Sequence, residues 1–192
     1  QLTQLGAVVY GTSVADTFTG FGDGRDVTFY GQGGDDTITF DYNAGNTIDG
    51  GAGNDTIKVN TTSYTSTKAN SIIGGTGNDV ITGGYGAETY LFNRGDGQDQ
   101  VTDFGGVDKL VFGSGIAASD LAISRVGGNM VVKITDPNNA AATDQITFVN
   151  WFSGTAYQIE AFNFADGSSL TAAQLTQLGA VVYGTSVADT FT

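Results

Sequence analysis

Residues with a carboxyl or amide side chain recur at nearly regular intervals along the first 110 residues, and each is followed by a short apolar step. They lie nine to eleven residues apart with one longer gap, at Asp16, Asp26, Asp36, Asn46, Asp55, Asn70, Asp79, Glu88, Asp99 and Asp108. The residue two places further along is apolar at nine of these ten positions, and only Thr28 departs. Glycines supply the positive φ values that tight loops need. The pattern predicts a repeated unit made of a tight loop and a strand of about three residues with one inward side chain.

After Asp108 the sequence changes to partly alternating apolar and polar residues, which favours strands. The expected strands are 121–126, 129–135, 144–152 and 158–164, and "VGGN" at 126–129 indicates a hairpin turn. Residues 170–179 predict a short helix, which begins with a capping box between Thr171 and Gln174 and stops at Gly179.

Composition and charge narrow the class of protein. The 192 residues include 30 glycines, yet 40% of them are hydrophobic, which is enough to build a core. The net charge is −13, and residues 1–108 alone carry −10, so nucleic acid is not expected as a partner. The chain has no Cys and no His, which excludes disulfides, Cys/His zinc sites and a Ser–His mechanism. No signal peptide or membrane span is expected, because the apolar runs are only a few residues long.

A second repeat has a much longer period. Residues 1–19, "QLTQLGAVVYGTSVADTFT", recur unchanged at 174–192, an offset of 173 residues. We interpret the chain as one unit of a tandem array in a larger protein, followed by the start of the next unit. An artificial duplication of the ends is the alternative.

The short repeats resemble a known family. "GGAGNDTIK" (50–58) and "GGTGNDVIT" (74–82) match the nonapeptide of RTX, or haemolysin-type calcium-binding, proteins, and 31–39 and 83–91 are near matches. Residues 90–113 and 149–170 resemble the domain that often follows these nonapeptides. The resemblance implies an all-β fold, in which a calcium-binding parallel β-roll (1–112) is followed by an antiparallel β cap with one short helix (113–179). Residues 180–192 would begin the next repeat.

The resemblance also implies where several Ca²⁺ ions would bind. Two nonapeptides make one turn, so loops 18–20 residues apart stack along one edge of the roll. One edge collects Asp16, Asp36, Asp55, Asp79 and Asp99, and the other collects Asp26, Asn46, Asn70, Glu88 and Asp108. Because amides neutralise no charge, we expect most of the calcium on the first edge, between the loops of residues 36/55, 55/79 and 79/99. The expected ligands there are the carboxylates of Asp36, Asp55, Asp79 and Asp99 with the carbonyls of Gly31, Gly33, Gly50, Ala52, Gly74 and Thr76. Asp16, Asp26 and Asp108 are further candidates.

The resemblance implies a non-catalytic structural module of a large secreted or cell-surface bacterial protein, of the extender or adhesin type. Such proteins typically leave the cell by type I secretion and would fold on meeting extracellular Ca²⁺, and the partners of this module would be calcium ions and neighbouring identical repeats. An accessory domain of a secreted enzyme is one alternative. Another is a carbohydrate-binding module, which would bind a surface glycan through residues 59–70 and the aromatic side chains.

Three local features have two interpretations each. Residues 59–70 break the repeat without a glycine, as either a calcium-free turn or a recognition loop. Arg94-Gly95-Asp96 is an integrin-binding tripeptide in other proteins, but here the loop pattern already demands its glycine. Trp151, Phe152, Phe162 and Phe164 are expected in the core that closes the roll, with an aromatic ligand platform as the alternative.

Overall fold

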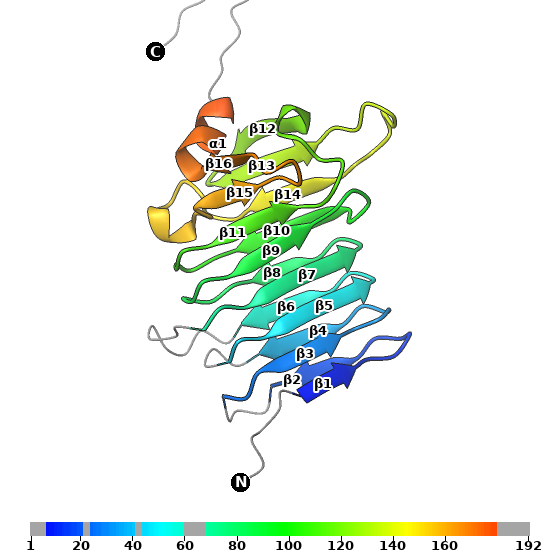
Figure 1. The fold of residues 1–192 in the computed structure, drawn as a ribbon. Coiled ribbons are helices and arrows are strands. Elements are labelled where there is room, and N and C mark those ends of the chain that lie inside the picture. The colour runs from blue at the N-terminus through cyan, green and yellow to red at the C-terminus, as the bar shows by residue number, and fades with distance from the viewer. Residues whose placement is uncertain (1–6, 21–23, 41–43, 60–67, 180–192) are drawn as a thin grey trace, which may run out of the picture.

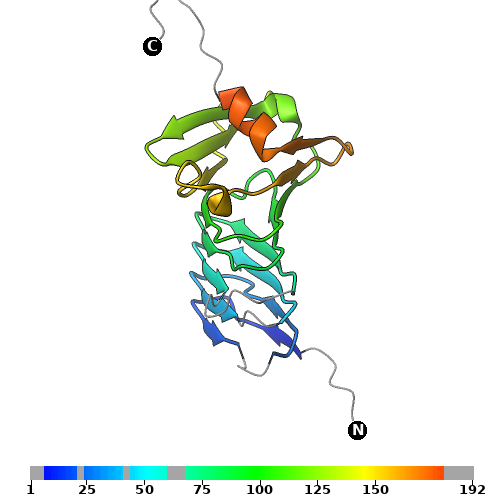
Figure 2. The same ribbon diagram turned by 90° about the vertical axis from the view of Figure 1, so that its left-hand side faces the viewer.

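The computed structural model describes residues 7–20, 24–40, 44–59 and 68–179, and it shows a rod made of two facing eight-stranded sheets (Figures 1 and 2). The first sheet has the order β1 (Ala7–Tyr10), β3 (Val27–Tyr30), β5 (Thr47–Ala52), β7 (Ser71–Thr76), β9 (Thr89–Phe92), β11 (Lys109–Phe112), β15 (Ala161–Asn163) and β16 (Ser169–Thr171). The second has the order β2 (Thr17–Thr19), β4 (Thr37–Phe40), β6 (Thr56–Val59), β8 (Val80–Thr82), β10 (Gln98–Thr102), β14 (Gln145–Phe148), β13 (Asn129–Ile134) and β12 (Leu121–Val126).

The chain coils between the two sheets, since each strand from β1 to β11 lies in the sheet opposite to the strand before it. Strands in one sheet pair in parallel with the strands two places earlier and later, as in β4 with β6 and β6 with β8. This is a parallel β-solenoid of about five turns, and it confirms the predicted β-roll.

Stacked apolar side chains fill the space between the sheets. Equivalent residues pair directly from turn to turn, in the rows Phe18, Ile38, Ile57, Ile81, Val101 and Ile48, Ile72, Tyr90, Leu110. The expectation of one inward side chain per strand is wrong for β4, β6, β9 and β11, because a second apolar residue points inward two places further along in these four strands. These residues are Phe40, Val59, Phe92 and Phe112, and all four are fully buried. The roll therefore has a wider core than the short repeat suggests.

The departure of Thr28 has a structural explanation. Thr28 pairs with Thr47, and Phe29 pairs with Ile48 and is buried, so Phe29 takes the inward place that the repeat assigns to residue 28. The strand is thus shifted by one residue relative to the repeat, and Val27 lies at the level of Asn46.

The cap continues both sheets. β14 pairs in parallel with β10, and β15 pairs in parallel with β11, so the first cap strands extend the roll by another turn. Only then do β13, β12 and β16 add antiparallel strands. The expected domain boundary after residue 112 falls in the connection that follows β11, and the two sheets run on past it.

The expected elements of the second half are present. The 121–126 strand is β12, and the turn to β13 has Gly127 at φ +61°. The strands expected at 144–152 and 158–164 are present as β14 and β15, and both are shorter than the sequence suggests. Two short 3₁₀ turns, Ala118–Asp120 and Thr155–Tyr157, complete this region.

The helix α1 (Ala172–Gly179) covers the end of the rod (Figure 2). Its capping box is confirmed, because the Thr171 N–H donates to Gln174 Oε1 at 2.8 Å and the Gln174 N–H donates to Thr171 Oγ1 at 3.3 Å. No helix within the described ranges is long and apolar enough to cross a membrane.

The alternation of β7 generates a stability prediction. Ile72 is completely buried between the sheets, whereas its neighbour Ile73 lies on the opposite, half-exposed face. With calcium present, Ile72→Ala should lower the free energy of unfolding by about 2–5 kcal/mol through lost burial and a cavity, and Ile73→Ala should cost less than half as much. Denaturant unfolding of both variants measures this, and equal losses would contradict the arrangement of the core.

Candidate metal centre

The first edge of the roll, where the chain passes from β1 to β2 and at each equivalent level, holds a ladder of aspartates. Each backbone N–H donates to Oδ1 of the next level: Asp16 to Asp36 at 2.8 Å, Asp36 to Asp55 at 2.8 Å, Asp55 to Asp79 at 2.7 Å and Asp79 to Asp99 at 3.0 Å. The ladder confirms that these five residues share one edge. It also fixes one oxygen of each of the four upper carboxylates.

The second oxygen of the middle carboxylates is different. Asp36, Asp55 and Asp79 are each 1% exposed, and their Oδ2 atoms have no hydrogen-bond partner among the described residues. A buried carboxylate oxygen without a partner is costly, since it has lost its water and gained nothing in return. Three such atoms at successive levels of one edge indicate a ligand that binds oxygen.

The backbone leaves room beside these oxygens because the loop begins with glycine. A Cβ at Gly31 would overlap both Asp36 Oδ2 and the carbonyl oxygen of Gly50, one turn further on. A Cβ at Gly50 would likewise overlap Asp55 Oδ2 and the Gly74 carbonyl oxygen. A carboxylate oxygen and a carbonyl oxygen thus converge on one point at these two levels, and only glycine leaves that point open.

Two other predicted carbonyl ligands of this edge, those of Ala52 and Thr76, already accept hydrogen bonds. The Ala52 carbonyl accepts the Gly34 N–H and the Thr76 carbonyl accepts the Gly53 N–H, both at 2.8 Å, while Gly33 forms a β-bridge with Ala52. These carbonyls each keep a second lone pair.

The lowest level of the edge differs from those above it. Asp16 Oδ2 accepts hydrogen bonds from the N–H and the hydroxyl of Thr12, at 2.6 and 2.9 Å, so a side chain satisfies the oxygen there.

Burial raises the pKa values of the carboxylates of Asp55, Asp79 and Asp99. It raises the pKa of Asp55 and of Asp79 to about 6, and the neighbouring carboxylates at the level below add to both shifts. Burial also raises the pKa of Asp99 to about 8, with repulsion from Asp79 and Asp96 as further causes. The backbone N–H donors of the ladder oppose these shifts without cancelling them. The folded edge therefore favours whatever neutralises it, either a proton or a cation.

Calcium fits this edge. All the available donors are carboxylate and carbonyl oxygens, the set that Ca²⁺ prefers, and the chain has no His or Cys to favour a transition metal. When bound, the ion supplies the positive charge that the stacked carboxylates lack.

On the opposite edge, amides take the place of carboxylates at the middle levels. The Asn46 side-chain N–H donates to Asn70 Oδ1 at 3.1 Å, and the Asn70 side-chain N–H donates to Glu88 Oε1 at 2.9 Å. Here the side chains bind one another directly, which supports the prediction that this edge holds few ions at its middle levels. Asp108 lies higher up, where its Oδ1 accepts the Glu88 N–H at 2.7 Å.

Asp26 does not take the buried place expected for it on the second edge, although its Oδ1 accepts the Gly45 N–H of the next turn at 2.7 Å. The shift at β3 places Val27 there instead, and the Val27 N–H donates to Asn46 Oδ1 at 3.2 Å. Asp26 is half-exposed and pairs with Lys68 at 3.5 Å. Residues 60–67, most of the 59–70 segment, lie outside the described residues, as do residues 180–192.

Two groups of polar residues were missed from the sequence. One is an outer ladder beside the first edge, in which the Asn54 N–H donates to Asp35 Oδ1 at 2.7 Å and the Asn78 N–H donates to Asn54 Oδ1 at 2.9 Å. The repeated "ND" pair is the signal for it. The other is Asp103, a buried carboxylate at the start of the loop that ends in Asp108. It takes the place of a glycine in the repeat.

The Arg94-Gly95-Asp96 segment joins the roll to the cap. Arg94 donates to the carbonyls of Gly115 and Thr135 and pairs with Asp120 at 2.7 Å. Asp96 is 5% exposed and accepts from Asn93. These contacts support the loop interpretation over an integrin motif, which needs an exposed aspartate.

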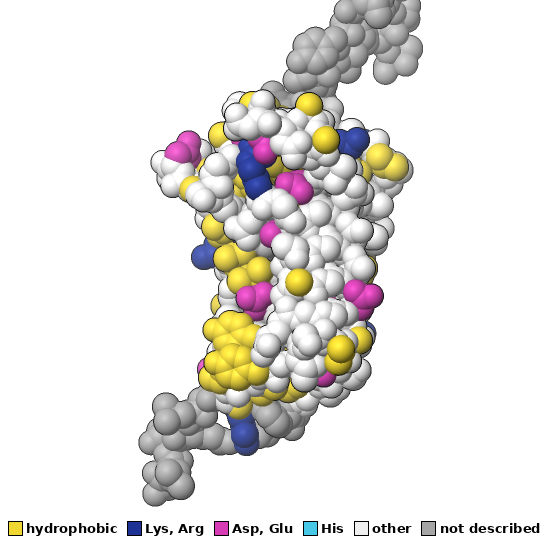
Figure 3. All heavy atoms as spheres, turned by 90° about the vertical axis from the view of Figure 1, so that its right-hand side faces the viewer, with side chains coloured by type: hydrophobic (Ala, Val, Ile, Leu, Met, Phe, Trp, Pro, Cys, Tyr) yellow, Lys and Arg dark blue, Asp and Glu magenta, His cyan; other side chains and the backbone are white. Residues whose placement is uncertain are grey.

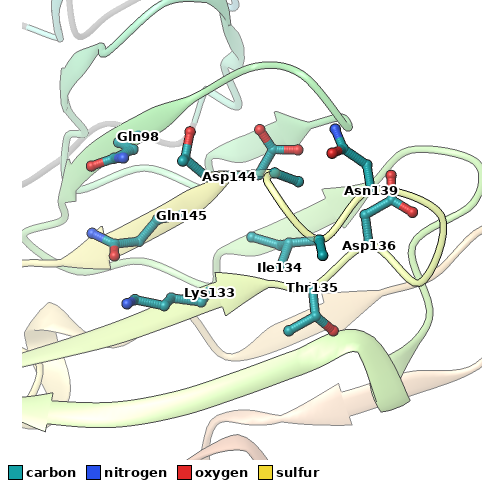
Figure 4. Close-up of a pocket in the computed structure, with 11 residues that line it drawn as sticks. Gln98, Lys133, Ile134, Thr135, Asp136, Asn139, Asp144 and Gln145 are labelled. Carbon is teal, nitrogen blue, oxygen red and sulfur yellow. The ribbon is translucent and has the colours of Figure 1, made fainter.

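A hollow of about 520 Å³ lies under the 135–144 connection of the cap (Figure 4). Its labelled polar side chains include Lys133, Asp136, Asn139 and Gln145, and none of the residues that line it is aromatic. Trp151 and Phe162 are fully buried, and Phe164 nearly so. These three belong to the core, as expected, and cannot form a ligand platform. Phe152 is only partly buried, where it packs against the core and the Arg125 guanidinium lies 4.3 Å from the centre of its ring.

Comparison with known proteins agrees with this geometry. Residues 42–59 and 64–99 match the RTX calcium-binding nonapeptide repeat (4 copies), and residues 129–174 match the haemolysin-type calcium binding protein related domain. The chain therefore belongs to the RTX calcium-binding repeat proteins. It is also similar to the "Iron-regulated protein FrpA" of Neisseria meningitidis serogroup C, at 35% identity over 94 residues. That match covers 47% of this chain and only 8% of the relative's length.

The raised pKa values predict how the calcium-free chain responds to pH. Asp55, Asp79 and Asp99 bind protons more tightly in the folded state than in the unfolded chain, where carboxyl groups titrate near pH 4. Between about pH 4 and pH 8 the folded state therefore holds more protons, so its stability falls as the pH rises. In EDTA, circular dichroism should show more β structure, and a higher melting temperature, at about pH 5 than at about pH 8. Greater stability at the higher pH would contradict the burial of these groups.

Proposed function

We propose that this chain is a structural unit that folds when Ca²⁺ neutralises the first edge of its roll. The observation that carries the proposal is the series of partnerless Oδ2 atoms on Asp36, Asp55 and Asp79. Each ion would lie between two loops and take oxygens from both, through the carboxylates of Asp36, Asp55, Asp79 and Asp99 and the carbonyls of Gly31, Gly50 and Gly74.

The charge of the roll supports a folding role for the ion. Residues 1–108 carry a net charge of −10, and the ladder brings like charges together in a buried place. Without cations, this repulsion opposes the compact state. Binding of calcium to the folded state alone stabilises it by RT ln(1 + [Ca²⁺]/Kd) for each site.

We further propose that such units stack end to end in a longer protein. The end of α1, residues 174–179, has the same sequence as residues 1–6, which directly precede β1. An array of this unit would therefore pass from the helix of one cap into the first strand of the next roll without a linker. β1 and α1 lie at opposite ends of the rod, as end-to-end stacking requires (Figure 1).

Apolar surface at both ends of the rod supports the same arrangement. Val8 and Tyr10 of β1 are more than half exposed, and Leu178 at the end of α1 is 46% exposed. Figure 3 shows hydrophobic side chains gathered toward the β1 end, where the rings of Tyr10 and Tyr30 stack with centroids 5.4 Å apart. A neighbouring unit would cover these side chains.

This proposal assigns the chain a mechanical rather than a catalytic role, as an extender in a secreted or cell-surface bacterial protein. Loops of this kind can bind calcium as weakly as roughly 10⁻⁴–10⁻³ M, the extracellular range, so folding would follow export. The FrpA match supports a long parent protein, because the chain aligns with a small part of that relative.

Adjacent carboxylates offer a matched test. Asp36→Asn keeps the Oδ1 acceptor of the ladder but replaces the partnerless oxygen with an amide N–H₂. It should remove one ion or weaken its binding by about tenfold or more, which corresponds to about 1.4 kcal/mol. Calorimetric titration with calcium measures both the number of ions and their affinity.

Asp35→Asn is the control, one residue away in the same loop. Asp35 is exposed, and the substitution keeps the acceptor for the Asn54 N–H. Calcium affinity should change by no more than about twofold, because solvent screens this charge. Equal effects of the two substitutions would show that the overall charge of the loop, and not the buried oxygen, binds the ion.

A further inference from the structure

A second group of buried carboxylates lies at the top of the opposite edge, where the roll meets the cap. Glu88 directly precedes β9, Asp103 directly follows β10 and Asp108 directly precedes β11. Each is 1% exposed, and one oxygen from each lies within 4.8 Å of the other two. A Ca²⁺ ion binds oxygens at about 2.3–2.6 Å, so oxygens this close can share one ion.

Two of these carboxylates have an oxygen that no described group satisfies. Glu88 Oε2 and Asp108 Oδ2 are buried and without a hydrogen-bond partner in the described part of the chain. Their other oxygens are engaged: Glu88 Oε1 accepts from Asn70 and Asp108 Oδ1 accepts the Glu88 N–H. The three carboxylates are thus close together, and two of them also have a buried oxygen that accepts no hydrogen bond from the described residues.

The third carboxylate is held in place from both sides. Asp103 Oδ1 accepts the hydroxyl of Tyr90, and Asp103 Oδ2 accepts the Gly105 N–H, both at 2.7 Å. Tyr90 is a core residue, 1% exposed, so the carboxylate is fixed against the interior of the roll. The Lys68–Asp26 and Arg94–Asp120 ion pairs involve none of the three carboxylates.

We propose that Glu88, Asp103 and Asp108 bind one further divalent cation, and that the ion is calcium because every donor is an oxygen. The site rests on the proposed calcium-dependent function but departs from the nonapeptide: a glutamate stands where the repeat has aspartate, and Asp103 stands where it has glycine. The site lies one level above Asn70. At the level of Asn70, side-chain amides form the hydrogen bonds, and no ion is expected there.

The position of the site gives the ion a specific role. The Asp108 N–H donates to Glu160 Oε2 at 2.6 Å, and β11 pairs with β15 directly after these two residues. Neutralising the three carboxylates would therefore stabilise the contact between the last turn of the roll and β15 of the cap, so that the two fold as one body.

Crystals of the full chain grown with CaCl₂ test the proposal directly, by anomalous diffraction at a long wavelength. The expected result is a calcium peak among Glu88, Asp103 and Asp108, in addition to peaks along the Asp36–Asp79 edge. Peaks along the first edge with none at Glu88 would overturn this site and leave the proposed function standing. The absence of calcium from both edges would overturn both.

A substitution provides a second measurement in solution. Asp103→Asn keeps an acceptor for Tyr90 but loses the acceptor for the Gly105 N–H and one negative charge. Native mass spectrometry in calcium should show one ion fewer per chain than in the wild type. Asp166→Asn is the control, since Asp166 is an exposed turn residue whose Oδ1 acceptor for Ser168 survives the change. A wild-type number of ions in Asp103→Asn would contradict the proposal. If that variant does not fold, the crystals of the wild type decide.

Discussion

The structure depends on one unfavourable arrangement, the stacking of buried carboxylates at successive turns of the roll. A backbone N–H fixes one oxygen of each, and for Asp36, Asp55 and Asp79 the other oxygen has no hydrogen-bond partner in the part of the chain that the structure describes. The same hydrogen bonds that align the turns therefore bring like charges together. A ligand that neutralises them contributes to the register of the whole solenoid, and not only to a single loop.

The two edges differ in how they satisfy the buried polar side chains that stack at successive turns. On the first edge the loop leaves an open point beside each free oxygen, because residues such as Gly31 and Gly50 have no Cβ. On the second edge, Asn46 and Asn70 satisfy one another through their amides. The middle levels of the second edge therefore have amide hydrogen bonds where the first edge has unpaired carboxylate oxygens, and the two edges lie on opposite sides of one apolar core.

Much of this arrangement could be predicted from the sequence. The spacing of Asp36, Asp55 and Asp79 gives the edge directly, because in a solenoid the distance along the chain sets the level of each loop. The one-residue shift at Asp26 could not be placed in this way, since either Val27 or Asp26 satisfies the spacing and only the burial of Phe29 decides between them. Asp103 was missed because it stands at a glycine position, where the repeat gives no reason to look for a ligand.

The size of the core was also underestimated from the repeat. A nonapeptide shows one obvious apolar position, but a second inward residue, such as Phe40 in β4 or Phe92 in β9, is present only in strands of four residues. Phe40 packs against the rings of Phe18 and Phe29 within the roll, whereas Phe112 stacks on Phe164 of the cap with ring centroids 5.0 Å apart. The cap could be predicted as β structure, but not as a continuation of the same two sheets. That continuation depends on parallel pairing between β10 and β14, which are far apart in the sequence, and local sequence patterns do not show which distant strands pair.

The most direct test of the central claim is a calcium titration of the intact chain near neutral pH, followed by small-angle X-ray scattering and by the fluorescence of Trp151. The scattering reports the extension of the roll, and Trp151, fully buried in the cap, reports the packing of the other end. The account predicts an expanded chain in EDTA that contracts steeply to a compact rod as calcium is added, with the fluorescence changing over the same range. A compact rod of unchanged dimensions after complete removal of calcium would contradict it.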